Sequence, residues 1–272
     1  MNLRTDLALE RCESLDKRNM RGVNIETVKK RCAKVSRIEV VNEEGAQAIG
    51  KPIGRYINVE VTPFARHAQF IDGSLGAVSE EIASLLPSSG SVLVAGKCAS
   101  MIFATRHITG ELLRATGLGK LRTVSAFATG VLGETGAEAG EMLKGLVDTL
   151  RPEAVITVDA LAARNVSRLG RTIQMCNTGI TPGSGVGNAR QEISEQTLGV
   201  PVIAVGVPTV VDAATLVSDY SGGRAGEEAA EMMVTPREVD LMIERAAKLT
   251  ALAINCALQP GISPEDMLML TA

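Results

Sequence analysis

The chain has 272 residues, of which 45% are hydrophobic, so it can bury the core of one or two domains. It carries 28 Lys and Arg against 31 Asp and Glu, a net charge of −3 that argues against nucleic acid or an anionic membrane surface as the main partner. The absence of Trp, with two Tyr and four Phe, also argues against a base-stacking platform.

Targeting and metal-binding signals are missing from the sequence. No run of roughly 18 apolar residues predicts a membrane span, and the charged N-terminus lacks the apolar region of a signal peptide. The five cysteines are scattered without a C-x-x-C pair, and the only histidines are His67 and His107. We therefore expect no metal and no cofactor, and a reducing, cytoplasmic location.

Taken in chain order, the first half begins with a charged, weakly periodic region. Residues 1–30 are expected to form an N-terminal arm. Partly alternating strands are predicted at 34–41 and 55–61, and apolar residues at three- and four-residue spacing predict a helix over 64–86.

Short, uniformly apolar runs follow, which are typical of strands buried on both faces. They lie at 91–96, 123–128, 154–158 and 202–207. Helical periodicity occupies 101–113 and 136–150. Residues 219–231 are expected to form a linker, and Thr235, Pro236 and Glu238 predict a capping box that opens a helix over 235–258.

This alternation of strands and helices predicts the fold class. We expect an α/β, layered architecture with a mostly parallel sheet and helices on both faces. One domain is expected over 1–272. In such folds the reactive groups lie at the carboxyl ends of the strands.

Carboxylates are the strongest candidates for chemistry. Asp159 directly follows the run 154–158, Asp212 follows 202–207, and Glu134 and Glu138 follow 123–128. Two of these acids at one edge of the sheet would suit acid–base catalysis. Asp159, Glu138 and Asp212 could instead each cap a helix.

Other motifs are weaker. Residues 183–188 contain Gly183, Ser184 and Gly185 in a G-x-G-x-G spacing, which fits neither a nucleophile elbow nor a dinucleotide-binding loop. They could contact substrate or only provide a flexible turn, and an α/β nucleotide-binding protein is disfavoured. A nucleophile–His arrangement would have to use His67 or His107, and His107 lies in a predicted helical run.

Several longer stretches resemble the germination (spore) protease family, the Gpr endopeptidases. They are spread over nearly the whole chain in the order found in that family. The matching stretches are 4–10, 54–56, 105–107, 124–126, 156–164, 178–188, 197–213 and 234–240.

The resemblance implies a cytoplasmic endopeptidase of the forespore or spore core that degrades small acid-soluble spore proteins at germination. It implies a homotetramer made as a zymogen, an aspartic-type mechanism despite a formal place among metallopeptidases, and a fold related to the hydrogenase-maturation proteases. The D-A-L-A-A-R motif places the second catalytic aspartate at Asp159. Processing is implied between Asp6 and Leu7.

One family motif is missing. The segment with the T-P-D sequence, which carries the first catalytic aspartate, would follow Gly96, yet no acid lies between Gly96 and Glu111. A lone Asp159 is expected to be ionised at pH 7 and unable to donate a proton. Three explanations stay open: a loop absent from this sequence, a catalytically impaired homologue that still binds peptide, or a substitute acid among Glu134, Glu138 and Asp212.

Overall fold

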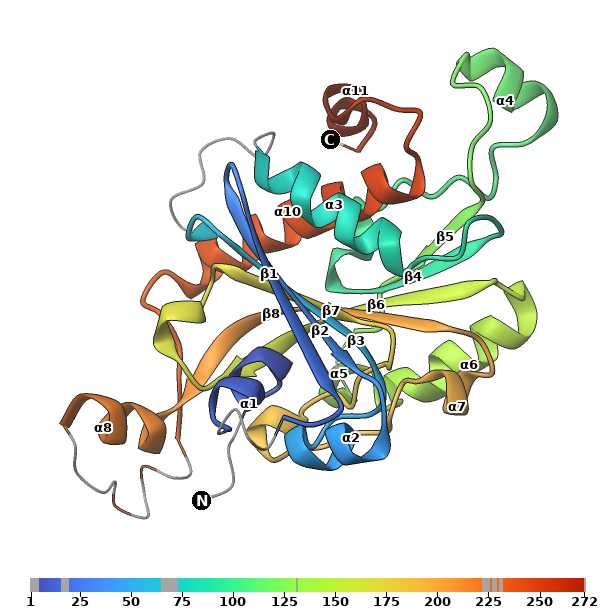
Figure 1. The fold of residues 1–272 in the computed structure, drawn as a ribbon. Helices are drawn as coiled ribbons and strands as arrows, with labels where there is room; N and C mark the ends of the chain where they lie inside the picture. The colour runs from blue at the N-terminus through green and yellow to red at the C-terminus, as the bar shows by residue number, and fades with distance from the viewer. Residues whose placement is uncertain are drawn as a thin grey trace.

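A mixed β-sheet forms the middle layer of the protein (Figure 1). The computed structural model describes residues 5–15, 20–64, 73–130, 132–221, 226, 229 and 232–271. Within these residues the strands are β1 (Val23–Lys30), β2 (Ala33–Val40), β3 (Gly54–Val61), β4 (Val92–Gly96), β5 (Val124–Phe127), β6 (Ala154–Ala163), β7 (Thr172–Cys176), β8 (Val202–Asp212) and β9 (Met233–Val234). Their order is β1-β2-β3-β7-β8-β6-β4-β5, with β9 beside β8.

The prediction of a mostly parallel sheet is wrong. The pairs β4–β5, β4–β6 and β6–β8 are parallel, whereas β1–β2, β2–β3, β3–β7, β7–β8 and β8–β9 are antiparallel. The uniform apolar runs correctly indicated the parallel half. The other half is antiparallel, and its edge strand β1 exposes most of its side chains, so this half carries no uniform apolar runs like those of the parallel half.

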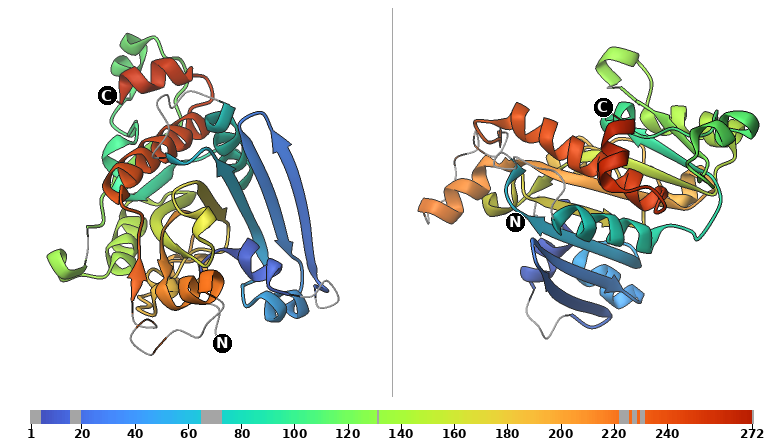
Figure 2. Two further views of the ribbon diagram at one scale, coloured as in Figure 1. Left: turned by 90° about the vertical axis from the view of Figure 1, so that its left-hand side faces the viewer. Right: turned by 90° about the horizontal axis from the view of Figure 1, so that it is seen from above.

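Helices cover both faces of the sheet, as the sequence predicts. On one face lie α3 (Gly73–Leu85) and α10 (Val239–Leu258), whose apolar side chains share the largest core cluster with β4, β6 and β8. The two further views show α10 lying across the sheet and β1–β3 at one edge (Figure 2).

The opposite face carries α6 (Ala139–Leu150) and α7 (Glu195–Leu198) under the parallel half, and α1 (Ala8–Glu13) and α2 (Glu43–Ile49) under the antiparallel half (Figure 1). The remaining helices are α4 (Gly110–Thr116), α5 (Leu132–Thr135), α8 (Ala213–Ser221) and α11 (Pro264–Leu270). None of the helices in the described ranges is long and apolar enough to cross a membrane.

Several predicted boundaries differ from the structure. Val23–Lys30, placed in the arm, forms β1, and β7 was not predicted. The helix expected over 64–86 begins at Gly73, and residues 65–72 lie outside the described residues. The helix expected over 101–113 begins only at Gly110, because a 3₁₀ turn and a loop precede it.

The C-terminal helix also begins later than predicted. It starts at Val239, and Glu238 occupies its N-cap position without a side-chain hydrogen bond. The Thr235 hydroxyl donates to the Thr209 carbonyl at 3.0 Å, so it ties the chain to β8 instead of forming a capping box. Of the predicted linker 219–231, the first residues belong to α8 and most of the rest lie outside the described residues.

Candidate active site

Asp159 lies within β6 and not after its end. The strand continues to Ala163, and Asp159 pairs with Gly206 of β8. It is half-buried, and its Oδ1 accepts the N–H of Ala160 at 2.8 Å. The last residue of β4, Gly96, pairs with Val158 of β6. Asp159 therefore lies one residue beyond the carboxyl end of β4. The strand pairing therefore places Asp159 at the expected edge of the parallel half.

The surroundings of Asp159 change the pKa of its carboxyl group. Burial raises the pKa of the Asp159 carboxyl above its ordinary value, and the Ala160 N–H lowers it in part. The negative charge of Asp6 raises this pKa again, whereas Lys97 lowers it. Burial and a like charge both disfavour the ionised form. The pKa of the Asp159 carboxyl therefore lies above that of a solvated aspartate, and its ionisation at pH 7 stays a prediction.

Glu138 shares a cavity with Asp159. This cavity, of about 280 Å³, is also lined by Gly96, Thr129, Pro182, Arg190, Gln191 and Ile193, among others. Glu138 occupies the N-cap position of α6, and its Oε1 lies 3.9 Å from Nη1 of Arg190. Within the described residues no hydrogen bond joins the carboxyl groups of Glu138 and Asp159. The structure brings these two acids to one cavity without a direct hydrogen bond between them.

Asp212 does not line this cavity. It ends β8, is 4% exposed, and accepts the N–H of Thr215 at 3.0 Å, so it caps α8. The side chain of Glu134, in α5, lies outside the described residues. Of the two candidate second acids whose side chains are described, Glu138 shares the cavity with Asp159.

An acid that was not expected in the site lies in the segment 5–13, here called the N-terminal strap. Oδ2 of Asp6 accepts the Ala162 N–H at 2.8 Å, and Oδ1 accepts the Ser184 hydroxyl at 3.0 Å. The Asp6 N–H donates to the Ala162 carbonyl at 2.9 Å. Asp6 thus pairs with the end of β6 and holds the glycine-rich loop against it.

The rest of the N-terminal strap is equally tied to the segment after Asp159. Leu7 is fully buried in a cluster with Leu161 and Ala163. The Glu10 carboxylate accepts the N–H groups of Arg164 at 2.6 Å and Asn165 at 2.8 Å. The strap therefore fixes residues 161–165, which follow the candidate catalytic aspartate.

The glycine-rich loop makes its contacts with the strap. Gly183 adopts a left-handed φ of 75°, and Ser184–Val186 form a 3₁₀ turn. Gly185 is buried, and a Cβ placed on it would overlap the Asp6 carboxylate and the Ala162 side chain. A side chain at position 185 would push the loop away from β6.

We expect Gly185→Ala to lower the free energy of unfolding by about 1–3 kcal/mol through this overlap. Gly145→Ala is the matched control, because Gly145 is helical and a Cβ added there would meet no atom within 4 Å. The control should be neutral or up to about 1 kcal/mol more stable. Urea unfolding measures both, and equal stability of the two variants would contradict the predicted overlap.

In the described part of the chain, we find no evidence for a catalytic histidine or for a metal site. His107 is exposed in a loop before α4, so its predicted helical setting is wrong, and His67 lies outside the described residues. Among the described residues no group of three His, Cys, Asp or Glu side chains could hold a metal ion.

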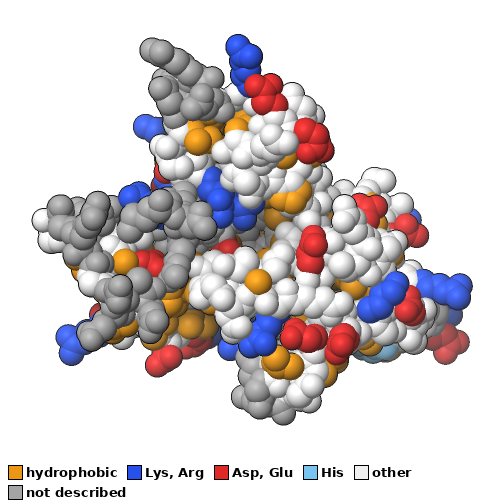
Figure 3. All heavy atoms as spheres, turned by 90° about the horizontal axis from the view of Figure 1, so that it is seen from below, with side chains coloured by type: hydrophobic (Ala, Val, Ile, Leu, Met, Phe, Trp, Pro, Cys, Tyr) orange, Lys and Arg blue, Asp and Glu red, His pale blue; other side chains and the backbone are white. Residues whose placement is uncertain are grey.

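Three charged residues near the site were missed from sequence. Lys97 follows β4 directly, so the strand-end rule that selected Asp159 could have found it. Asp6 and Arg190 reach the site through long-range packing, and no local sequence pattern predicts them. Basic and acidic side chains are interspersed over the face seen from below (Figure 3).

A layered α/β fold that places two carboxyl groups in one cavity beside its parallel strands defines a candidate acid–base hydrolase. A family model described as germination protease matches residues 4–221. The chain belongs to the germination protease family, and the sequence resemblance is confirmed.

Curated relatives agree with this assignment. The germination protease of Caldanaerobacter subterraneus is 37% identical over 98% of this chain and 97% of its own length. That of Clostridium perfringens is 36% identical over 98% of both chains, and that of Priestia megaterium 38% over 80% of this chain and 66% of its own. The first two alignments span 316 and 322 positions, more than the 272 residues here, so these relatives contain segments without a counterpart in this chain.

Proposed function

We propose that the protein is an endopeptidase that degrades small acid-soluble spore proteins at germination. The observation that carries the proposal is the cavity that Asp159 and Glu138 share beside the parallel strands. Family membership supports peptidase activity, since the relatives are named germination proteases.

The mechanism we propose assigns different roles to the two carboxyl groups. Asp159, whose pKa is raised, protonates the carbonyl oxygen or the leaving amine of the scissile peptide bond as a general acid. Glu138 accepts a proton from the attacking water on the other side of the cavity. Arg190 holds the Glu138 side chain, and Lys97 lies close enough to Asp159 to affect its charge. Glu138 would then replace the aspartate of the missing T-P-D segment.

The proposal also covers the assembly of the protein, its location in the cell and its processing. The chain acts in the cytoplasm of the forespore or spore core as a homotetramer, is made as a zymogen, and shares the fold of the hydrogenase-maturation proteases. Processing falls between Asp6 and Leu7. Thr5 is 2% exposed and Leu7 fully buried, so cleavage there requires the strap to leave β6 first.

A second candidate is a catalytically impaired homologue that binds peptide without cutting it. The absence of any acid between Gly96 and Glu111, where the family pattern has its first aspartate, favours it. The two candidates differ in the fate of a bound substrate.

Incubation of the purified chain with an α/β-type small acid-soluble spore protein tests the proposal. Intact-mass spectrometry should show fragments with the wild type, and Glu138→Gln should reduce the rate by about 10²-fold or more. Glu141→Gln, an exposed acid on the same helix, is the matched control and should cleave at the wild-type rate. Binding without fragments would establish the impaired homologue instead.

A further inference from the structure

A second polar cavity lies on the other side of the glycine-rich loop. It has a volume of about 270 Å³ and is bounded by the N-terminal strap, the turn between α2 and β3, the end of β7, the interior of β8 around Val205, and the loop 178–184. Thr181 and Ser184 line this cavity, whereas Pro182 lines the Asp159 cavity. We call it the strap cavity. The proposed chemistry at Asp159 does not use it.

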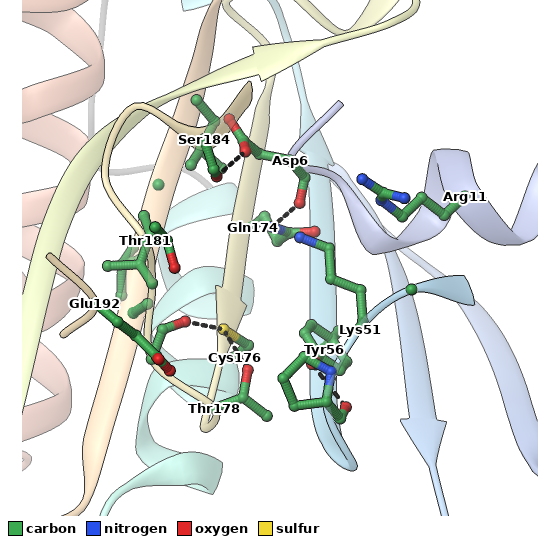
Figure 4. A pocket seen from close by; sticks show the side chains of 18 residues that line it. Asp6, Arg11, Lys51, Tyr56, Gln174, Cys176, Thr178, Thr181, Ser184 and Glu192 are labelled. Carbon is green, nitrogen blue, oxygen red and sulfur yellow. Dashed lines mark hydrogen bonds between the residues drawn. The ribbon is translucent and has the colours of Figure 1, made fainter. Parts of the chain in front are cut away.

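Two basic side chains enter the strap cavity from one wall. Lys51 and Arg11 lie on the side of α2 and α1, and Thr181, Ser184 and Glu192 lie opposite (Figure 4). Lys51 follows the left-handed Gly50 that ends α2, with φ of 61°. This turn directs the chain along the wall of the cavity, and the Lys51 side chain extends toward Gln174 and Asp6 (Figure 4).

In the part of the chain that the structure describes, neither Lys51 nor Arg11 has a hydrogen-bond partner for each of its donors. Within the described residues, the Lys51 ammonium makes no hydrogen bond or ion pair. Among the described residues the buried Nε of Arg11 has no partner, and Nη2 makes a long contact of 3.4 Å with the Thr5 carbonyl. Both side chains are half-buried, and cations withdrawn from water without partners are costly, so a cavity lined by the two favours an anion.

Within the described residues the acids of the strap cavity form no ion pair with these cations. Both oxygens of Asp6 already accept hydrogen bonds from Ala162 and Ser184. Glu192 is exposed, so solvent screens its charge. Because Asp6 nevertheless remains a fixed negative charge close by, a ligand with one negative charge suits the cavity better than one with two.

We propose that the strap cavity binds a single carboxylate group through Lys51 and Arg11. The hydroxyl groups on the opposite wall would receive the polar remainder of the ligand. The carboxylate can belong to a free small acid or to an acidic side chain of a bound peptide. The second source rests on the proposed peptidase function, and the binding experiment below requires no turnover.

The affinity of the cavity for a carboxylate should depend on pH. Burial lowers the pKa of Lys51, Asp6 and Cys176 oppose this shift, and Arg11 adds to it. Tyr56 and Glu192 complete the titratable groups that face the cavity, and burial raises the pKa of the Tyr56 hydroxyl. A bound anion favours the charged ammonium, so its affinity should fall as the pH rises through the lowered pKa of Lys51.

Isothermal titration of the full chain tests the proposal with N-acetyl-glutamate N-methylamide, its neutral glutamine analogue, acetate and phosphate. We expect the glutamate compound to bind, the glutamine analogue not to bind, and the affinity for the glutamate compound to fall as the pH rises. Tight acetate binding would identify free acids as the source, and binding of the glutamate compound alone would identify a peptide side chain. Equal or tighter binding of phosphate would overturn the inference.

Two lysine variants test whether the carboxylate binds in the strap cavity. Lys51→Met should weaken binding at least tenfold, while Lys144→Met, an exposed lysine paired with Asp148 on α6, should bind as the wild type does. Unchanged affinity in Lys51→Met, or no binding of any carboxylate to the wild type, would overturn the proposal. The comparison of the glutamate and glutamine compounds on the wild type does not depend on how the variant folds.

Discussion

Asp159→Asn is expected to abolish measurable cleavage of a spore-protein substrate, with a loss of about 10²–10⁴-fold. The amide has nearly the shape of the carboxyl group but cannot donate an acidic proton. Because burial and the Asp6 charge raise the pKa of Asp159 in the folded state, the wild type loses stability as pH rises from the unfolded pKa through the folded one. The variant avoids this loss and should be at least as stable at neutral pH.

Thermal unfolding of both proteins at several pH values measures this difference. The stability advantage of Asp159→Asn should shrink as the pH falls below about 4, where both states of the wild type are protonated. Asp148→Asn, an exposed acid on α6, is the control and should retain activity. Full activity in Asp159→Asn would remove Asp159 from the mechanism.

Leu7→Ala should lower the free energy of unfolding by about 2–5 kcal/mol, the usual range for a fully buried leucine. The cavity would open between the N-terminal strap and β6, beside Leu161 and Ala163. Leu268→Ala removes a leucine that is 43% exposed on α11 and should cost much less.

Urea unfolding of these two leucine variants provides the measurement. If Leu7→Ala unfolds at the same urea concentration as Leu268→Ala, the strap does not stabilise the native fold. A large loss would support a structural role of the strap and would mean that processing between Asp6 and Leu7 has an energetic cost.

The parallel half of the fold could be predicted from sequence because its strands carry uniform apolar runs. All of these runs form strands, and β6 and β8 extend several residues further than predicted. The extension matters, since it places Asp159 inside a strand and not after it. β7 was missed because its five residues include the polar Thr172 and Gln174, which are buried in the sheet.

Only the site residues that follow a predicted strand could be predicted from the sequence. Asp159 and Glu138 follow apolar runs, and the structure places both in one cavity. Asp6 is separated from Asp159 by about 150 residues of chain, and its approach depends on the packing of Leu7 and Glu10 against β6. The same packing builds the strap cavity, whose basic residues Arg11 and Lys51 have no motif in the sequence.

The proposed mechanism requires Asp159 to hold a proton above the pH at which a solvated aspartate releases it. A carboxyl ¹³C NMR titration of the folded chain tests it, with the Asp159 resonance assigned by its loss in Asp159→Asn. The account predicts a midpoint above the ordinary value of about 3.9, lowered in Asp6→Asn because the like charge is removed. A midpoint at or below that value in the wild type would contradict the assignment of Asp159 as the general acid.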